Sequence, residues 1–65
     1  MASPTGIIPE ELLVPAKRQE VIRWLREQAF TADLKRQLLL GWAQWVGARL
    51  RQRDYDAVTG TGIDR

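Results

Sequence analysis

The fold is decided by residues 32–53, which read ADLKRQLLLGWAQWVGARLRQR. Apolar side chains recur in this stretch at the spacing of an α-helix, and on a helical wheel they cover nearly half of the circumference. They are Leu34, Leu38, Leu39, Trp42, Trp45, Val46 and Leu50. The opposite side carries Arg36, Gln37, Gln44 and Arg51. The pattern predicts one long amphipathic helix, with an apolar stripe wider than a single neighbouring helix can cover.

A shorter helix is predicted upstream, over residues 16–29. One side of it carries Val21, Ile22, Leu25 and Ala29, preceded in the same phase by Val14. Between the two helices, Thr31 can cap the second through its hydroxyl group, and Asp33 suits the positive end of that helix. Residues 9–13 are expected to form a short helical arm, which Pro15 ends. We therefore expect an all-α fold, an amphipathic helical hairpin with a short N-terminal helical arm.

Two glycines complicate the long helix, because glycine in a helix interior costs about 1 kcal/mol relative to alanine. They are Gly41 and Gly47. The alternative is a compact three-helix unit with a break at Gly41. The apolar phase continues across Gly41, which favours the hairpin. We expect a flexible lead-in over residues 1–8, a single helical domain over 9–54 and a flexible tail over 55–65.

The chain has 65 residues and contains neither cysteine nor histidine. A domain of this size buries only about 60% of the surface that its unfolded chain would expose, and the usual aids to its stability are disulfides, a structural metal or self-association. The composition therefore predicts no metal site and no cofactor. It favours self-association, with two hairpins pairing into a dimeric helical bundle.

The same composition argues against catalysis. Without His or Cys, and with Ser3 as the single serine, the usual pairs of nucleophile and general base are missing. We expect a non-enzymatic protein with no small-molecule substrate. The absence of Cys and of a leader segment predicts a cytoplasmic location. The longest mostly apolar stretch, residues 38–50, is too short for a transmembrane segment.

The charge is unevenly distributed along the chain. Residues 1–15 and 54–65 each carry a net charge of −2, whereas residues 16–53 hold nine Lys/Arg against three acidic residues, a net +6. An antiparallel hairpin would gather five of these cations at its open end, namely Lys17, Arg18, Arg49, Arg51 and Arg53. Such a cluster suits the phosphates of DNA or RNA. Residues 19–42 also match a helix-turn-helix weakly, because the second helix offers few base-reading side chains.

Three functions follow from these surfaces. The leading expectation is a small regulatory or adaptor protein that binds a protein partner, or another copy of itself, through an apolar helix face. That face consists of Leu34, Leu38, Trp42, Trp45 and Val46, and tryptophan is enriched where interfaces concentrate their binding energy. The alternative is a nucleic-acid-binding regulator that uses the basic cluster. An amphipathic helix at a membrane interface ranks third.

Overall fold

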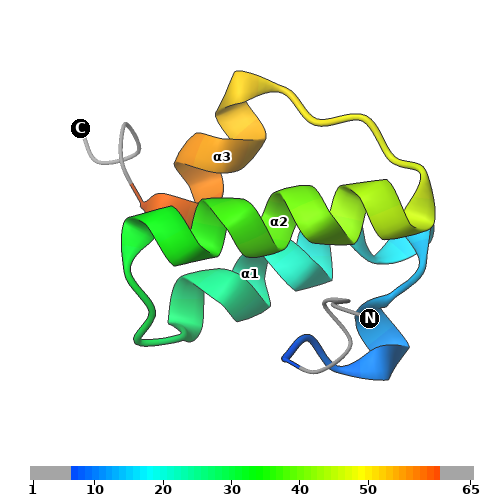
Figure 1. Cartoon of the computed structure of the whole chain (residues 1–65), viewed down its shortest axis with the longest axis horizontal. Helices are drawn as coiled ribbons and strands as arrows, with labels where there is room; N and C mark the ends of the chain where they lie inside the picture. Colours follow the sequence, from blue (N-terminus) through cyan, green and yellow to red (C-terminus); the bar gives the residue numbers. More distant parts are fainter. Residues whose placement is uncertain (1–6, 61–65) are drawn as a thin grey trace.

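A computed structural model of the chain describes residues 7–60, and all its regular elements in that range are helical. Three α-helices form the body (Figure 1): α1 (Arg18–Glu27), α2 (Ala32–Val46) and α3 (Gln52–Thr59). Two 3-10 turns precede them, at Glu10–Leu12 and Pro15–Lys17. The expected all-α class is confirmed, and the chain forms a three-helix unit.

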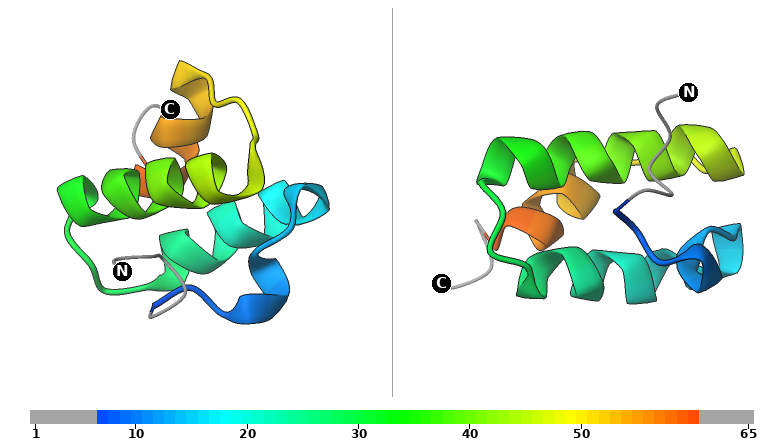
Figure 2. Two further views of the ribbon diagram at one scale, coloured as in Figure 1. Left: turned by 45° about the vertical axis from the view of Figure 1, so that its right-hand side comes forward. Right: turned by 60° about the horizontal axis from the view of Figure 1, so that its bottom comes forward.

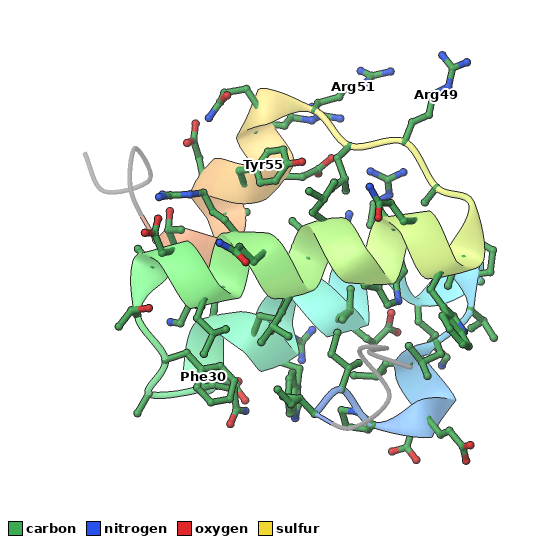
Figure 3. All side chains as sticks on the ribbon, in the orientation of Figure 1. Phe30, Arg49, Arg51 and Tyr55 are labelled. Carbon is green, nitrogen blue, oxygen red and sulfur yellow. The ribbon has the colours of Figure 1, made fainter. Side chains whose placement is uncertain are left out.

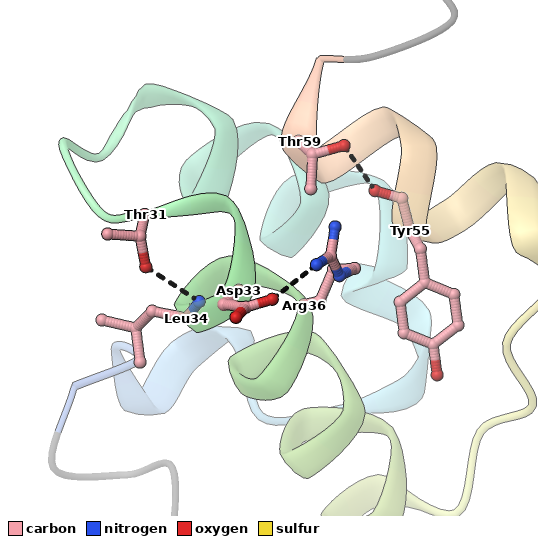
Figure 4. A network of polar contacts seen from close by, with 6 residues as sticks. All are labelled: Thr31, Asp33, Leu34, Arg36, Tyr55 and Thr59. Atoms are coloured by element: carbon pink, nitrogen blue, oxygen red, sulfur yellow. Dashed lines mark hydrogen bonds and ion pairs between the residues drawn. The ribbon is translucent and has the colours of Figure 1, made fainter.

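The first two helices run antiparallel and side by side, as the right-hand view of Figure 2 shows. Residues 28–31 connect them. Thr31 caps α2 as predicted, because its Oγ1 accepts a hydrogen bond from the Leu34 backbone N–H at 3.2 Å (Figure 4). At the end of α1, the Gln28 side chain donates to the Trp24 carbonyl at 3.0 Å, so one carbonyl of the last turn has a partner.

The predicted long helix is wrong beyond Val46. Gly47 ends α2 in the left-handed conformation, with φ of 76°, and the Ala48 N–H donates to the Ala43 carbonyl at 2.8 Å. Gly41, where the three-helix alternative placed a break, lies inside an unbroken α2. The helix therefore ends at the other glycine, since of these two residues it is Gly47 that adopts a backbone conformation that side chains with a Cβ disfavour.

Beyond this turn the chain crosses back and forms α3, which packs against both α1 and α2. Residues 55–59, which the sequence assigns to a flexible tail, thus make up most of a packed helix, and the remaining tail residues 61–65 lie outside the described residues. Val58 of α3 is completely buried. The third helix therefore covers part of the wide apolar stripe, a role for which the sequence suggested a second copy of the chain.

A single core joins the three helices and the N-terminal arm. Its buried members are Ile8, Val21, Ile22, Leu25, Leu38, Leu39, Trp42, Ala43 and Val58. The arm is tied to α2 because the Trp42 indole N–H donates to the Leu12 carbonyl. Ile8 belongs to this core and not to the flexible lead-in predicted over residues 1–8, of which residues 1–6 lie outside the described residues.

We predict that Gly47→Ala lowers the free energy of unfolding by about 1–2 kcal/mol, measured by urea denaturation. No heavy atom outside its immediate chain neighbours lies within 4 Å of a Cβ added there, so the loss would come from backbone strain alone. A glycine inside a continuous helix behaves in the opposite way, because alanine stabilises that setting. A more stable Gly47→Ala variant would thus argue for the unbroken helix over residues 32–53.

Candidate nucleic-acid interface

An ion pair joins the start of α1 to the start of α3. Arg18 donates through Nη1 to Oδ2 of Asp54 at 2.8 Å, and the two side chains are 32% and 11% exposed. The same Asp54 oxygen accepts the backbone N–H of Arg51, the residue that precedes α3, at 2.9 Å. Asp54 therefore satisfies an otherwise unpaired donor at the helix start while it holds the Arg18 guanidinium in place.

A surface pocket of about 380 Å³ lies at this junction. It is lined by Arg18, Gln19, Ile22, Arg51, Arg53, Asp54 and Ala57. Three arginines against one aspartate leave the lining with a net charge of +2. Because Asp54 already accepts two hydrogen bonds from Arg18 and Arg51, its negative charge is partly neutralised within the protein. The pocket is thus suited to an anionic group.

The connection between α2 and α3 extends this basic region. It carries Arg49 and Arg51, and Figure 3 shows both side chains pointing outward from the loop, away from α2. Arg53 is exposed in the first turn of α3. Within residues 7–60, the ion pairs are Arg18 with Asp54 and Arg36 with Asp33, so none involves Arg49, Arg51 or Arg53. We refer to Arg18, Arg49, Arg51 and Arg53 as the arginine surface.

Four of the five cations that the sequence places together belong to this surface, but they meet by a different route. The sequence predicts that they meet at the open end of a hairpin, because Arg18 begins the first helix and the other three end the second. In the structure, the reversal after Gly47 brings Arg51 and Arg53 to α1. Lys17 is exposed in the turn before Arg18 and does not line the pocket.

Sequence reasoning missed Asp54, which it counted only as part of an acidic C-terminal segment. The residue is 92% buried, since 8% of its surface remains exposed. A signal for it exists in the sequence, because Asp54 stands three residues after Arg51, the spacing at which an acidic side chain can reach back to the residue before a helix. That signal applies only if a new helix begins near residue 52.

The apolar face predicted for a protein partner is divided between core and surface. Trp42 and Leu38 are buried in the chain's own core, while Val46 is half-buried. Trp45 remains 56% exposed and Leu34 38% exposed. A partner of the folded chain would therefore meet Trp45 and Val46 in the last turn of α2 and Leu34 in its first turn, and would not reach Trp42.

A second pocket of about 310 Å³ lies over the other side of α1. Its lining is formed by Pro9, Glu11, Leu12, Glu20, Arg23, Trp24 and Glu27. Glu20 and Glu27 of α1 both line it, and the N-terminal arm adds Glu11. The two pockets beside α1 therefore have linings of opposite net charge, and the arginine surface is the one suited to an anion.

Comparisons with known proteins give no relative from which a site could be transferred, because no family model, curated protein or solved structure matches this chain. Within residues 7–60, no helix combines the length and the apolar character needed to cross a bilayer. The same residues contain no group of three or more His, Cys, Asp or Glu side chains arranged to hold a metal ion.

We predict that Asp54→Ala lowers the free energy of unfolding by about 2 kcal/mol, because it removes the acceptor of two hydrogen bonds, one of them from a charged donor. Urea denaturation measures the loss. In a double-mutant cycle with Arg18→Ala, the pair should show a coupling of at least about 0.5 kcal/mol. Arg36→Ala is the matched control, since its ion pair with Asp33 is exposed and contributes little. Additive effects of the Arg18 and Asp54 variants would contradict this account of the junction.

Proposed function

We propose that this protein is a small, non-enzymatic nucleic-acid-binding protein that holds phosphate groups on its arginine surface. The observation that carries the proposal is the pocket between α1 and α3, where Arg18, Arg51 and Arg53 line one cavity. Guanidinium groups bind phosphate oxygens through paired hydrogen bonds and remain charged at all physiological pH values.

The arrangement favours binding to an external anion over pairing within the protein. Arg49, Arg51 and Arg53 are exposed, and no carboxylate within residues 7–60 forms an ion pair with them. A phosphate would therefore displace water and counterions from these three residues without breaking an internal salt bridge. Arg18 is held by Asp54 through Nη1, which leaves its other N–H groups able to donate to a ligand.

Binding should depend steeply on salt. We predict that log Kobs for a fluorescently labelled DNA of mixed sequence falls with log salt concentration, by about 0.9 for each arginine–phosphate contact on a duplex and by about 0.7 on a single strand. Fluorescence anisotropy across a salt series measures this slope. The double variant Arg51→Glu/Arg53→Glu should lose binding at low salt, because it reverses two of the four charges.

Arg23→Glu serves as the control for that experiment, since Arg23 is also exposed but lines the acidic pocket on the other side of α1. It changes the net charge by the same amount per residue and should retain most of the affinity. Equal losses from Arg23→Glu and from a single reversal at Arg53 would show that net charge, and not the arginine surface, governs binding. In that case the proposed site is wrong.

A second candidate function is favoured by one observation, the 56% exposure of Trp45. An indole left in water on α2, about three helical turns from the exposed Leu34, is a suitable anchor for a regulatory or adaptor protein that binds a partner, including a second copy. Capture of this kind would use α2 and leave the arginine surface open.

For that candidate, we predict that Trp45→Ala weakens self-association, measured by light scattering over a range of concentrations, and leaves DNA affinity unchanged. The free energy of unfolding at low protein concentration should change little, because most of the Trp45 side chain is outside the core. A wild-type protein that stays monomeric at all concentrations would remove self-association from consideration. Arg51→Glu/Arg53→Glu is the reciprocal control, since it should leave the solution mass unchanged.

A further inference from the structure

The first turn of α3 projects from the body of the molecule. Figures 1 and 2 show that the ribbon at the N-terminal end of α3 rises above α2, whereas its C-terminal end packs between α1 and α2. On its inner side the raised end is joined to α1 by the ion pair between Asp54 and Arg18. Arg51, Gln52 and Arg53 at this end are all exposed. An α-helix with its side chains is about 10–12 Å across, close to the ≈ 12 Å width of the major groove of B-form DNA. The turn therefore has the shape to enter that groove.

Single-stranded nucleic acid is a poorer fit, because proteins that bind it usually provide aromatic side chains on which bases stack. None of the residues that line the arginine pocket is aromatic. Tyr55 is half-buried and stands two positions after Arg53, about 200° round the helix and so on its other side. Trp24 and Phe30 pack edge to face against each other at a centroid distance of 6.4 Å. Trp45 is 56% exposed but does not line the pocket either. The pocket therefore offers charges without a stacking platform, which favours a duplex.

Arg51 precedes the helix, so the exposed side chains of the helical turn itself are Gln52 and Arg53, and Arg53 is the one available to read a base. The Gln52 amide donates to Oδ1 of Asp56 at 3.1 Å, so it is engaged along the helix. Arg53 has no ion pair within residues 7–60, and arginine donates two parallel hydrogen bonds to O6 and N7 of guanine. The carboxylate of Asp56, one turn further along, would repel phosphates and limits the contact to the first turn.

From these features we propose that the first turn of α3 enters the major groove of double-helical DNA, with Arg53 contacting a guanine and with Arg18 and Arg49 holding phosphates beside it. The inference rests on the proposed nucleic-acid binding and names its substrate as duplex DNA. Duplex RNA does not fit, since side chains cannot read its deep and narrow major groove. Asp54 and Val58 bury the opposite side of α3, which fixes the orientation of the helix.

The test begins with selection of preferred sequences from a randomised DNA duplex library by the full chain. Binding to the selected duplex is then measured by fluorescence anisotropy for the wild type, Arg53→Ala and Arg49→Ala. We expect Arg53→Ala to lower affinity for the selected duplex by about 5- to 150-fold, the range for a bidentate contact to a base. Its effect on a mixed-sequence duplex should be no larger than that of Arg49→Ala, which removes only a phosphate contact.

A change in the DNA completes the test. Replacing the preferred guanine by 7-deazaguanine removes the N7 acceptor and should weaken binding of the wild type, while Arg53→Ala should be insensitive to the replacement. Circular dichroism of both variants checks that α3 and the remaining helices are retained. Because both arginines are exposed, unfolding of either variant is not expected.

The outcomes separate this inference from the function on which it rests. Salt-dependent binding to duplex DNA without enrichment of any sequence, or with equal sensitivity of both proteins to 7-deazaguanine, would overturn groove entry by α3 and leave phosphate binding in place. Tighter binding to a single strand or to duplex RNA would also overturn it. A chain that binds none of the three nucleic acids would overturn the proposed function itself.

Discussion

The left-handed backbone conformation at Gly47 is the constraint on which the rest of the structure depends. A right-handed residue at this position would carry α2 onward past the end of α1, leaving its wide apolar stripe partly in water. Instead the chain reverses, and the Ala48 N–H finds the Ala43 carbonyl at the helix end. The reversal returns Val58 to the core, where it is completely buried. A stripe too wide for one neighbouring helix thus acquires two, α1 and α3.

The same reversal creates the electrostatic arrangement of the molecule. It delivers Asp54 to Arg18 and places Arg51 and Arg53 around the pocket that they share. A buried aspartate is costly unless its charge is compensated, and here one carboxylate oxygen accepts both an arginine side chain and a helix-start N–H. Stability and the proposed phosphate binding would therefore be linked at this junction, because the residue that fixes α3 against α1 also orients one of the four arginines.

The two surfaces that suggest function differ in how much of each remains exposed in the folded chain. In the apolar face, Trp42 and Leu38 are buried in the core, and Trp45 and Leu34 remain exposed. The fold brings basic residues from distant segments together, because Arg18, Arg51 and Arg53 line one cavity. Within residues 7–60, no ion pair involves Arg49, Arg51 or Arg53. The sequence favours a protein-binding adaptor over a nucleic-acid-binding regulator. The structure leaves less of the apolar face exposed and clusters the arginines, so nucleic-acid binding is the first proposal and a protein partner the second.

The sequence by itself determined the helices that local forces specify. Val21, Ile22 and Leu25 mark the buried side of α1, and Thr31 caps α2 through the hydroxyl that its position predicts. Both depend on residues within one or two helical turns of each other, which periodicity and capping preferences describe well.

Only the tertiary structure decided where the long helix ends, because Gly41 and Gly47 have the same intrinsic propensity and the apolar phase continues through both. The choice between them depends on whether residues 52–59 gain more by covering the core than by extending the helix, a balance of contacts distant in sequence. The partner of Asp54 was hidden for the same reason, since Arg18 lies 36 positions away. The arginine pocket therefore depends on the chain reversal after Gly47. The sequence shows that these residues are basic, but not that they line one pocket.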